Sequence, residues 1–221
     1  DVGNIPVVLS GDEASAGLNA VEFIDGSLNN IFRVGWNSFP TSYFFLQSIP
    51  IRIFGQTTLA LRFLSAIAGA LTVGALYIVA RHMFDNTVAL LSAIFLAGLH
   101  YHNHFSRIGL NNVWDGLLFV VVLGFLWYGW EKESRPAFLF AGFFLGFLQY
   151  FYVSGRTLYL FVPAWCVLVG IFDWPKFKRN LSNLILLELV ALVTFLPLAI
   201  YFVENPSEFM APMRRVSILG P

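Results

Sequence analysis

Long apolar stretches separated by short polar breaks dominate the chain from residue 59 onwards. A membrane-spanning helix needs about 20 mainly apolar residues, with roughly 17 to 25 acceptable. Six stretches meet this requirement with their flanks, and we expect a spanning helix in each: Leu59–Ala80, Val88–Phe105, Val113–Trp130, Ala137–Val153, Leu158–Phe172 and Leu184–Val203. Because the breaks are short, neighbouring helices should run antiparallel in a compact bundle.

The first 58 residues follow a different pattern. Val21–Phe32 mixes apolar and polar residues at helical spacing, whereas Phe39–Gly55 is apolar but contains Pro40, Pro50 and Arg52. This second run is short and interrupted, so we expect it to lie along the membrane surface rather than to cross it.

The basic residues of the short breaks predict the orientation of the bundle, because cytoplasmic loops carry an excess of Lys and Arg. Most of them lie in the breaks after the first, third and fifth expected spans: Arg81, Lys132, Arg135, Lys176, Lys178 and Arg179. The alternate breaks hold only Arg107 and Arg156. The first set is therefore expected in the cytoplasm, and the opening loop is expected at the outer face.

We therefore predict an all-α integral membrane protein in three parts. These are an extracytoplasmic loop with surface helices over 1–58, a bundle of about six helices over 59–203, and the start of a further extracytoplasmic loop over 204–221. The composition agrees, since 57% of the residues are hydrophobic and 17% aromatic, with a mean hydropathy of +0.71. One soluble core of 221 residues could not bury so much apolar surface.

Net charge and cysteine content narrow the possible classes of protein further. The formal net charge is zero, so no basic surface for nucleic acid is expected. The single cysteine, Cys166, cannot form an intrachain disulfide. The chain begins with Asp1, and no signal segment opens it, so we expect a fragment or a processed chain.

Two adjacent carboxylates, Asp12 and Glu13, stand out in a chain that is only 12% charged. One interpretation is structural: Asp12 caps the N-terminus of a helix and Glu13 occupies its favoured first turn. The other is chemical, with a carboxylate that removes a proton from an acceptor or holds a metal ion.

Three further charged residues share the expected outer face with this pair. Arg107 and Arg156 are either arginines that extend toward the lipid headgroups or clamps for a phosphate. Asp115 lies just inside the outer end of its span, where an ionisable group indicates a functional site, with Arg107 as its natural partner. A structural Asp–Arg pair that fixes the loop is the alternative.

Other features carry weaker signals. His100 and His104 share a helix face and would provide two ligands of a metal site, or they belong to an interfacial belt with neighbouring aromatic residues. Gly142 and Gly146 form a GxxxG motif, which allows close approach of two helices. Glu188 lies near the cytoplasmic end of its expected span and should extend toward the headgroups.

The order of several segments resembles one family. These segments are "SGDEASAGLNAVEFIDG", "FGQTTLALRFLSAIAGALTVGALYIVARHMF", "HFSRIGLNNVWDGLLFVV" and "GFLQYFYVSGRTLYLFVP". Together they are similar to the polyprenyl-phosphate-dependent membrane glycosyltransferases of GT-C architecture, which include protein O-mannosyltransferases and lipid A aminoarabinose transferases. The family has a spanning helix before the acidic pair and further spans after "MRRVSILGP", so we expect an N-terminal portion of a longer enzyme.

The resemblance implies a reaction and a role for each candidate residue. Sugar would pass from a polyprenyl phosphate to an acceptor protein, lipid or glycan, with inversion of configuration. Asp12 would be the general base, and Glu13 would orient the acceptor or help to hold a metal. Arg156 with Arg107 would stabilise the leaving phosphate, and Asp115 would position Arg107.

The resemblance also implies a setting. The enzyme would sit among membrane lipids, in a plasma membrane of bacterial type, with its active site on the extracytoplasmic face. No cofactor follows from these motifs, and a divalent metal stays open. Two alternatives remain: a transporter or flippase of lipid-linked sugars, which would place charges at the membrane midplane, and a noncatalytic membrane scaffold.

Overall fold

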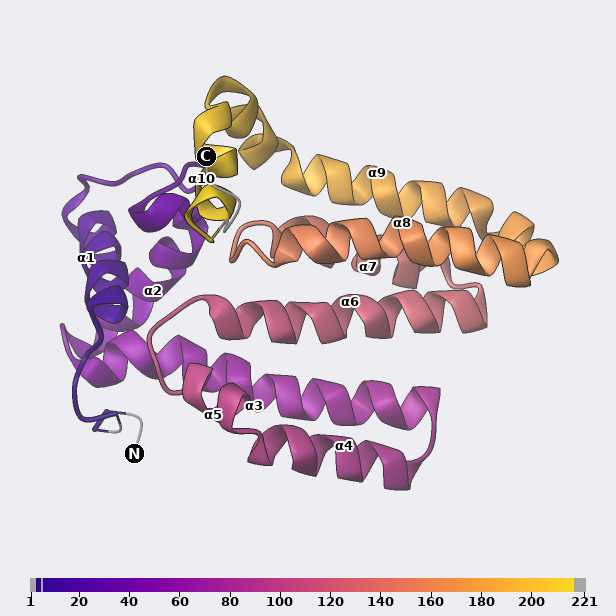
Figure 1. Ribbon diagram of the computed structural model, residues 1–221, viewed down its shortest axis with the longest axis horizontal. Helices are drawn as coiled ribbons and strands as arrows, with labels where there is room; N and C mark the ends of the chain where they lie inside the picture. The colour runs from indigo at the N-terminus through magenta and orange to yellow at the C-terminus, as the bar shows by residue number, and fades with distance from the viewer. Residues whose placement is uncertain (1–2, 5, 217–221) are drawn as a thin grey trace.

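The structure is a computed structural model that describes residues 3–4 and 6–216. The regular elements in these ranges are helices: α1 (Gly11–Asp25), η1 (Trp36–Ser38), α2 (Thr41–Phe54), α3 (Thr58–Met83), α4 (Asn86–Gly98), α5 (His100–Phe105), α6 (Asn112–Lys132), α7 (Arg135–Leu148), α8 (Gly155–Phe172), α9 (Trp174–Glu204) and α10 (Pro206–Val216). The predicted all-α class is confirmed, with α3, α4, α6, α7, α8 and α9 side by side in a bundle (Figure 1).

Four helices in the described part of the chain are long and apolar enough to cross a membrane: α3, α6, α8 and α9. The other two expected spans are shorter than the sequence predicted. α4 has 13 residues and α7 has 14. At 1.5 Å per residue each is about 20 Å long, which is less than the roughly 30 Å of a hydrocarbon core.

Polar side chains explain where these two helices stop. α4 ends at Gly98, and the Asn103 side chain donates to the Ala97 carbonyl at 2.6 Å. α7 ends at Leu148, and the amide of Gln149 donates to the carbonyls of Leu145 and Gly155. The last carbonyls of a helix lack backbone partners, and these side-chain amides donate hydrogen bonds to such carbonyls. A count of apolar residues does not register such local competition.

Capping side chains mark the starts of two of the long helices, α3 and α9. The Thr57 hydroxyl accepts from the Ala60 N–H at 3.2 Å, at the start of α3. Asp173 ends α8 and also begins α9, where its carboxylate accepts from the Lys176 N–H at 3.1 Å. The basic stretch that the sequence placed in a break is therefore the first turns of α9.

Because α9 is longer than expected, Glu188 has a different position in its helix. The sequence predicted Glu188 near a span end, but α9 has 31 residues and Glu188 lies in its middle. Its Oε1 atom is buried and has no hydrogen-bond partner within residues 3–4 and 6–216. The expected extension toward the headgroups is therefore wrong.

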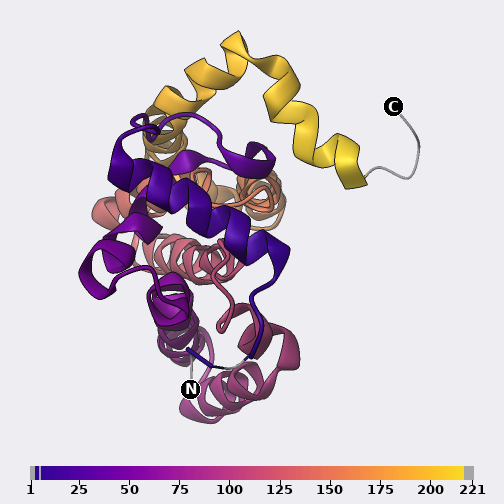
Figure 2. The ribbon, with the colours of Figure 1, turned by 90° about the vertical axis from the view of Figure 1, so that its left-hand side faces the viewer.

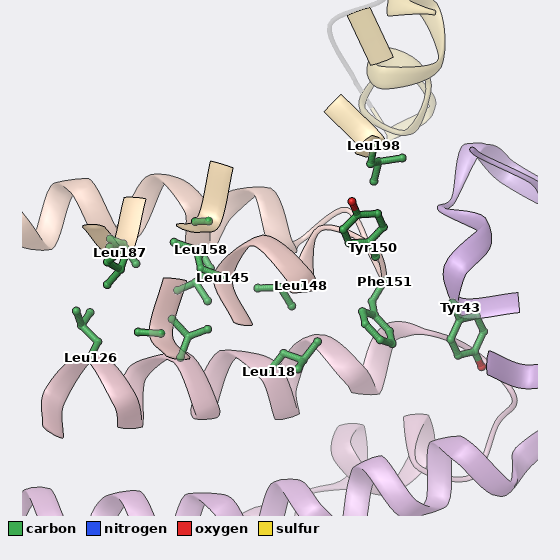
Figure 3. Packing of buried hydrophobic residues seen from close by; sticks show 14 of the residues in the cluster. Tyr43, Leu118, Leu126, Leu145, Leu148, Tyr150, Phe151, Leu158, Leu187 and Leu198 are labelled. Atoms are coloured by element: carbon green, nitrogen blue, oxygen red, sulfur yellow. The ribbon is translucent and has the colours of Figure 1, made fainter. Parts of the chain in front are cut away.

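The main core joins α6, α7, α8 and α9, as Figure 3 shows for leucines from each helix. The backbones of α7 and α9 approach closely at the GxxxG motif. A Cβ atom on Gly142 would lie 2.3 Å from the Leu187 carbonyl oxygen, and one on Gly146 would lie 2.4 Å from that of Ala191. The predicted close approach is confirmed, because only glycine fits at these two positions.

One end of the bundle differs from the other. α1 and α2 lie at the end where α6 and α8 begin, and α1 crosses this end in the second view (Figures 1 and 2). α10 follows α9 at the same end. The α5–α6 and α7–α8 connections also meet there, where Asn111 Nδ2 donates to the Phe151 carbonyl at 2.6 Å. This end gathers the polar residues that the sequence singled out.

Candidate functional site

The first turn of α1 is fixed by a capping box. The Ser10 hydroxyl accepts from the Glu13 N–H, and the Glu13 carboxylate accepts from the Ser10 N–H, both at 3.2 Å. This reciprocal pair satisfies two backbone donors at the helix start. The N-cap is therefore Ser10, and the structural interpretation of Asp12 as the cap is wrong.

Asp12 is exposed in this first turn. A carboxylate at a helix N-terminus is stabilised by the backbone N–H groups that point toward it. Its side chain makes no hydrogen bond or ion pair with the part of the chain that the structure describes. The Asp12 carboxylate is thus available to a ligand.

Glu13 is in the opposite situation, because it is fully buried. Its Oε1 accepts from Arg62 Nε and from the Gly109 N–H, each at 2.8 Å, and its Oε2 accepts from Arg62 Nη2 at 3.1 Å. Burial alone would raise the pKa of Glu13. The hydrogen bonds from Arg62, Gly109 and Ser10 outweigh it and hold the pKa below its usual value.

These contacts change the role expected for Glu13. Both carboxylate oxygens are occupied by donors and shielded from solvent, so the residues present do not fit a metal ion at this carboxylate. The same contacts exclude an acceptor molecule from it. Glu13 instead fixes the helix turn that carries Asp12.

Arg62 is a site residue that the sequence reasoning missed. Its side chain is fully buried in α3, and Nη1 donates to the Pro6 carbonyl at 2.8 Å. An arginine this close to the start of an apolar span is costly unless it is paired. That signal was present in the sequence, because Arg62 is the only charged residue in the apolar run from Leu59 to Ala80.

The lowered pKa of Glu13 predicts a pH dependence of stability. A carboxyl with a folded pKa below its unfolded value stabilises the fold above the unfolded pKa, and this contribution is lost as the pH falls through the folded pKa. We therefore expect the difference in thermal midpoint between wild type and Glu13→Gln to be constant at neutral pH. It should shrink below about pH 4.5, the ordinary value.

Thermal unfolding in detergent from pH 7 to pH 3 measures this difference, and the glutamine variant removes the contributions of other carboxyls. A difference that grew on acidification would contradict the prediction.

The loop before α6 is held against α2, α3 and α1. Gln47 Nε2 donates to the Gly109 carbonyl at 3.0 Å and to the Leu61 carbonyl at 3.1 Å. A side chain at Gly109 would collide with Leu61, since a Cβ atom would lie 2.7 Å from Leu61 Cγ. Arg107 is on this fixed loop and is exposed.

Asp115 lies in the first turn of α6 and is 9% exposed. The sequence predicted Arg107 as its partner, but within the described residues no ion pair joins the two. The Ser154 hydroxyl donates to Asp115 Oδ2 instead, and the backbone of Tyr152 and Gly155 also faces the carboxylate. Asp115 is therefore joined to the α7–α8 connection rather than to the Arg107 loop.

A cavity of about 450 Å³ opens beside Asp115, between α4, α5, α6 and α8. Its polar lining is contributed by Tyr101, His102, Asn112, Asp115, Tyr152, Ser154 and Thr157. Its apolar lining is contributed by Leu96, Leu99, Phe105, Val113, Phe119 and Leu148. The cavity thus offers polar and apolar surface to a single ligand.

Tyr152 connects this cavity to Asp12. Burial raises the pKa of the Tyr152 phenol, the Asn112 side chain lowers it, and the charges of Tyr101, Asp115 and Asp12 raise it further. Asp12 is therefore near enough to act electrostatically on a residue that lines the cavity. The exposed carboxylate and the cavity thus lie at the same end of the bundle.

Arg156 faces α10. Its Nη1 donates to the Phe209 carbonyl at 2.6 Å, and its guanidinium carbon lies 4.0 Å from the centre of the Phe209 ring and 5.4 Å from that of Phe202. Its neighbours Gly155 and Thr157 line the cavity. Arg156 thus stands behind the cavity wall and is held by the start of α10.

His100 and His104 are neighbours, as the sequence predicted, with ring centres 6.2 Å apart. Both are exposed. Among the residues that the structure describes, no group of three or more His, Cys, Asp or Glu side chains could hold a metal ion. The pair has no third protein ligand there.

Comparisons with known proteins show which family and which solved structures this chain is similar to. Residues 38–201 match the family described as dolichyl-phosphate-mannose-protein mannosyltransferase. The crystal structure of ArnT from Cupriavidus metallidurans in the apo state has a TM-score of 0.72 at 19% identity, over 93% of this chain and 40% of that chain. The same protein bound to undecaprenyl phosphate has a TM-score of 0.70 at 19% identity, over 91% and 38%.

These matches show the fold of the chain and how much of the length of its relatives it spans. At 19% identity the ArnT structures show a shared fold, and this chain spans about two fifths of their length. No curated protein sequence matches the chain. The family resemblance stated from the sequence is confirmed.

Proposed function

Because the chain belongs to the dolichyl-phosphate-mannose-protein mannosyltransferase family, we propose that it is part of a membrane glycosyltransferase that moves a sugar from a polyprenyl phosphate to an acceptor. The observation that carries this proposal is the cavity with polar and apolar walls at the end of the bundle where α1 exposes Asp12. Such a lining suits an amphiphilic ligand, with the sugar phosphate on the polar side and isoprene units on the apolar side. ArnT, which shares the fold, has been crystallised with undecaprenyl phosphate.

Asp12 is the general base of the proposed reaction. Its carboxylate takes the proton of the acceptor hydroxyl or amine as that group attacks the anomeric carbon. The new bond forms on the side opposite the phosphate, and the electron pair of the broken carbon–oxygen bond leaves with the phosphate. The configuration at the anomeric carbon is therefore inverted.

The arginines supply charge stabilisation for the leaving group. Phosphate is a good leaving group, so positive charge near its oxygens serves it better than an acid does. Arg156 is proposed for this role, with a phosphate oxygen taking the place of the Phe209 carbonyl as its acceptor. Arg107, exposed on its fixed loop, is proposed as the second cation.

The proposed reaction takes place at the extracytoplasmic face of a plasma membrane of bacterial type. α6 and α8 begin at the same end of the bundle as α1, which carries Asp12, whereas the connections that follow α3, α6 and α8 lie at the opposite end (Figure 1). Near the short connections between the bundle helices, six Lys and Arg residues lie at that opposite end and two, Arg107 and Arg156, at this one, and this asymmetry supports a cytoplasmic placement of the opposite end.

Proteoliposomes that contain the full-length protein and a radiolabelled polyprenyl phosphate sugar test the proposal. We expect label to move to an added acceptor only when donor and acceptor are on the outer face. Movement of intact donor between leaflets without transfer would instead indicate a flippase. Neither activity would indicate a scaffold, and both of these results would overturn the proposal.

Substitution of Arg156 tests the phosphate role. We expect Arg156→Ala to lower kcat/KM for the donor by roughly 10²–10³-fold, because the charge that stabilises the leaving phosphate is lost. Arg156→Lys should keep part of the activity, since it retains the charge without the bidentate geometry. Initial rates at varied donor concentration measure both.

Arg33→Ala is the matched control, because Arg33 is an exposed arginine in the loop between α1 and α2, at the same end of the bundle as the start of α8. It should retain wild-type kinetics. An unchanged donor KM and kcat in Arg156→Ala would remove Arg156 from the mechanism.

A further inference from the structure

Asp115 lines the cavity and has one buried carboxylate oxygen without a hydrogen-bond partner among the described residues. Its Oδ2 accepts from Ser154, whereas its Oδ1 is buried and has no hydrogen-bond partner within residues 3–4 and 6–216. The side chain is 9% exposed and lines the cavity. An orphan acceptor of this kind is rare in native structures and calls for a partner.

The chemistry of the atom limits what that partner is. In its ionised form the Asp115 carboxylate only accepts hydrogen bonds, so a ligand that satisfies Oδ1 in this form must donate. Leaving such a buried acceptor unsatisfied costs free energy, and binding a donor recovers it. A phosphate or another anion would be repelled from this position.

The neighbouring lining favours a neutral polyhydroxylated ring. Tyr101 and Tyr152 provide aromatic surface, and Asn112, Ser154 and Thr157 provide short neutral polar groups. A sugar ring presents hydroxyl donors at its edge and apolar C–H groups on its faces, so it matches both kinds of surface.

We propose that Asp115 determines sugar specificity by accepting a hydrogen bond from one ring hydroxyl of the transferred sugar through Oδ1. This inference rests on the proposed function and adds to it where the sugar lies: at the polar wall formed by the first turn of α6 and the α7–α8 connection. Ser154 then positions the carboxylate by its bond to Oδ2.

Binding to a full-length Asp12→Asn protein tests the inference without turnover. The probes are radiolabelled polyprenyl phosphate mannose and its mono-deoxy analogues, each with one ring hydroxyl removed. With Asp115 present, loss of one particular hydroxyl should weaken binding about 10–100-fold, the value of a hydrogen bond to a charged group. The other deoxy analogues should bind within about threefold of the parent.

The Asp115→Ala change supplies the decisive comparison. The parent donor should bind about 10–100-fold more weakly, and the sensitive deoxy analogue should bind no worse than the parent. Glu22→Ala is the matched control, because Glu22 is an exposed carboxylate on α1 that does not line the cavity. It should keep the discrimination between the two ligands.

Three results would overturn the inference. One is that the preference for the parent donor over the sensitive deoxy analogue is the same with and without Asp115. Asp115 would then only hold the α7–α8 connection in place. Another is that all deoxy analogues bind like the parent while Asp115 is present, a measurement that stands even if the alanine variant does not fold. The third is an amino-sugar analogue that binds more than tenfold better, which would make the ligand group a cation.

Failure of the proposed function gives a different pattern. In that case the wild-type protein transfers no label to an acceptor in proteoliposomes, whichever analogues the Asp12→Asn protein binds.

Discussion

Replacement of Asp12 by asparagine is expected to lower sugar transfer by the full-length protein about 10²–10⁴-fold. An amide has the size of the carboxylate but does not take up the acceptor proton. Because Asp12 is exposed and its turn is capped by Ser10 and Glu13, the thermal midpoint should stay at the wild-type value. Transfer of labelled sugar in proteoliposomes and unfolding in detergent measure the two quantities.

Glu22→Gln is the matched control for this substitution. Glu22 is an exposed carboxylate on the same helix, and its neutralisation should leave transfer unchanged. Donor binding should also survive in Asp12→Asn, since the base acts on the acceptor. Turnover near the wild-type rate in Asp12→Asn would refute the assignment of the base.

Loss of the Arg62 guanidinium should have the largest effect on stability. Arg62→Ala leaves the Glu13 carboxylate buried without its ion-pair partner, and breaking a buried pair in this way costs about 3–5 kcal/mol. It also removes the donor to the Pro6 carbonyl. We expect a large fall in the thermal midpoint of the full-length protein in detergent, and a loss of transfer because the turn that carries Asp12 is no longer fixed.

Two further variants distinguish the loss of the Arg62–Glu13 ion pair from a nonspecific loss of stability. Arg52→Ala removes an exposed arginine from α2 and should leave the midpoint within a degree or two of wild type. The double change Arg62→Met with Glu13→Leu replaces both charges by apolar side chains and should recover much of the lost stability. If Arg62→Ala unfolds at the same temperature as Arg52→Ala, the ion pair does not stabilise this end of the bundle.

Periodicity and composition predicted the all-α class and the positions of most helices. They succeeded at α3, α6 and α8 because an apolar run long enough to span a membrane has few other ways to satisfy its backbone. They failed at the ends of α4 and α7, where Asn103 and Gln149 bond to nearby carbonyls. Such choices depend on single side chains and not on average hydropathy.

The candidate site was only partly predictable. The grouping of Asp12, Arg107, Asp115 and Arg156 at one end followed from the alternation of the spans. Their partners did not follow, because Ser154 is 39 residues from Asp115 and Phe209 is 53 residues from Arg156. A charged pair such as Asp115 and Arg107 is the obvious expectation when only sequence distance is known.

The contact between Glu13 and the Gly109 N–H also bears on the order in which the protein folds. The two residues are 96 positions apart. At a synthesis rate of about 5–20 residues per second, the ribosome makes the second partner roughly 5–20 s after the first. The turn that carries Asp12 therefore gains its contact with Gly109 only after the α5–α6 connection has been synthesised. A nascent chain that stops before Gly109 lacks the contact that completes this end of the bundle.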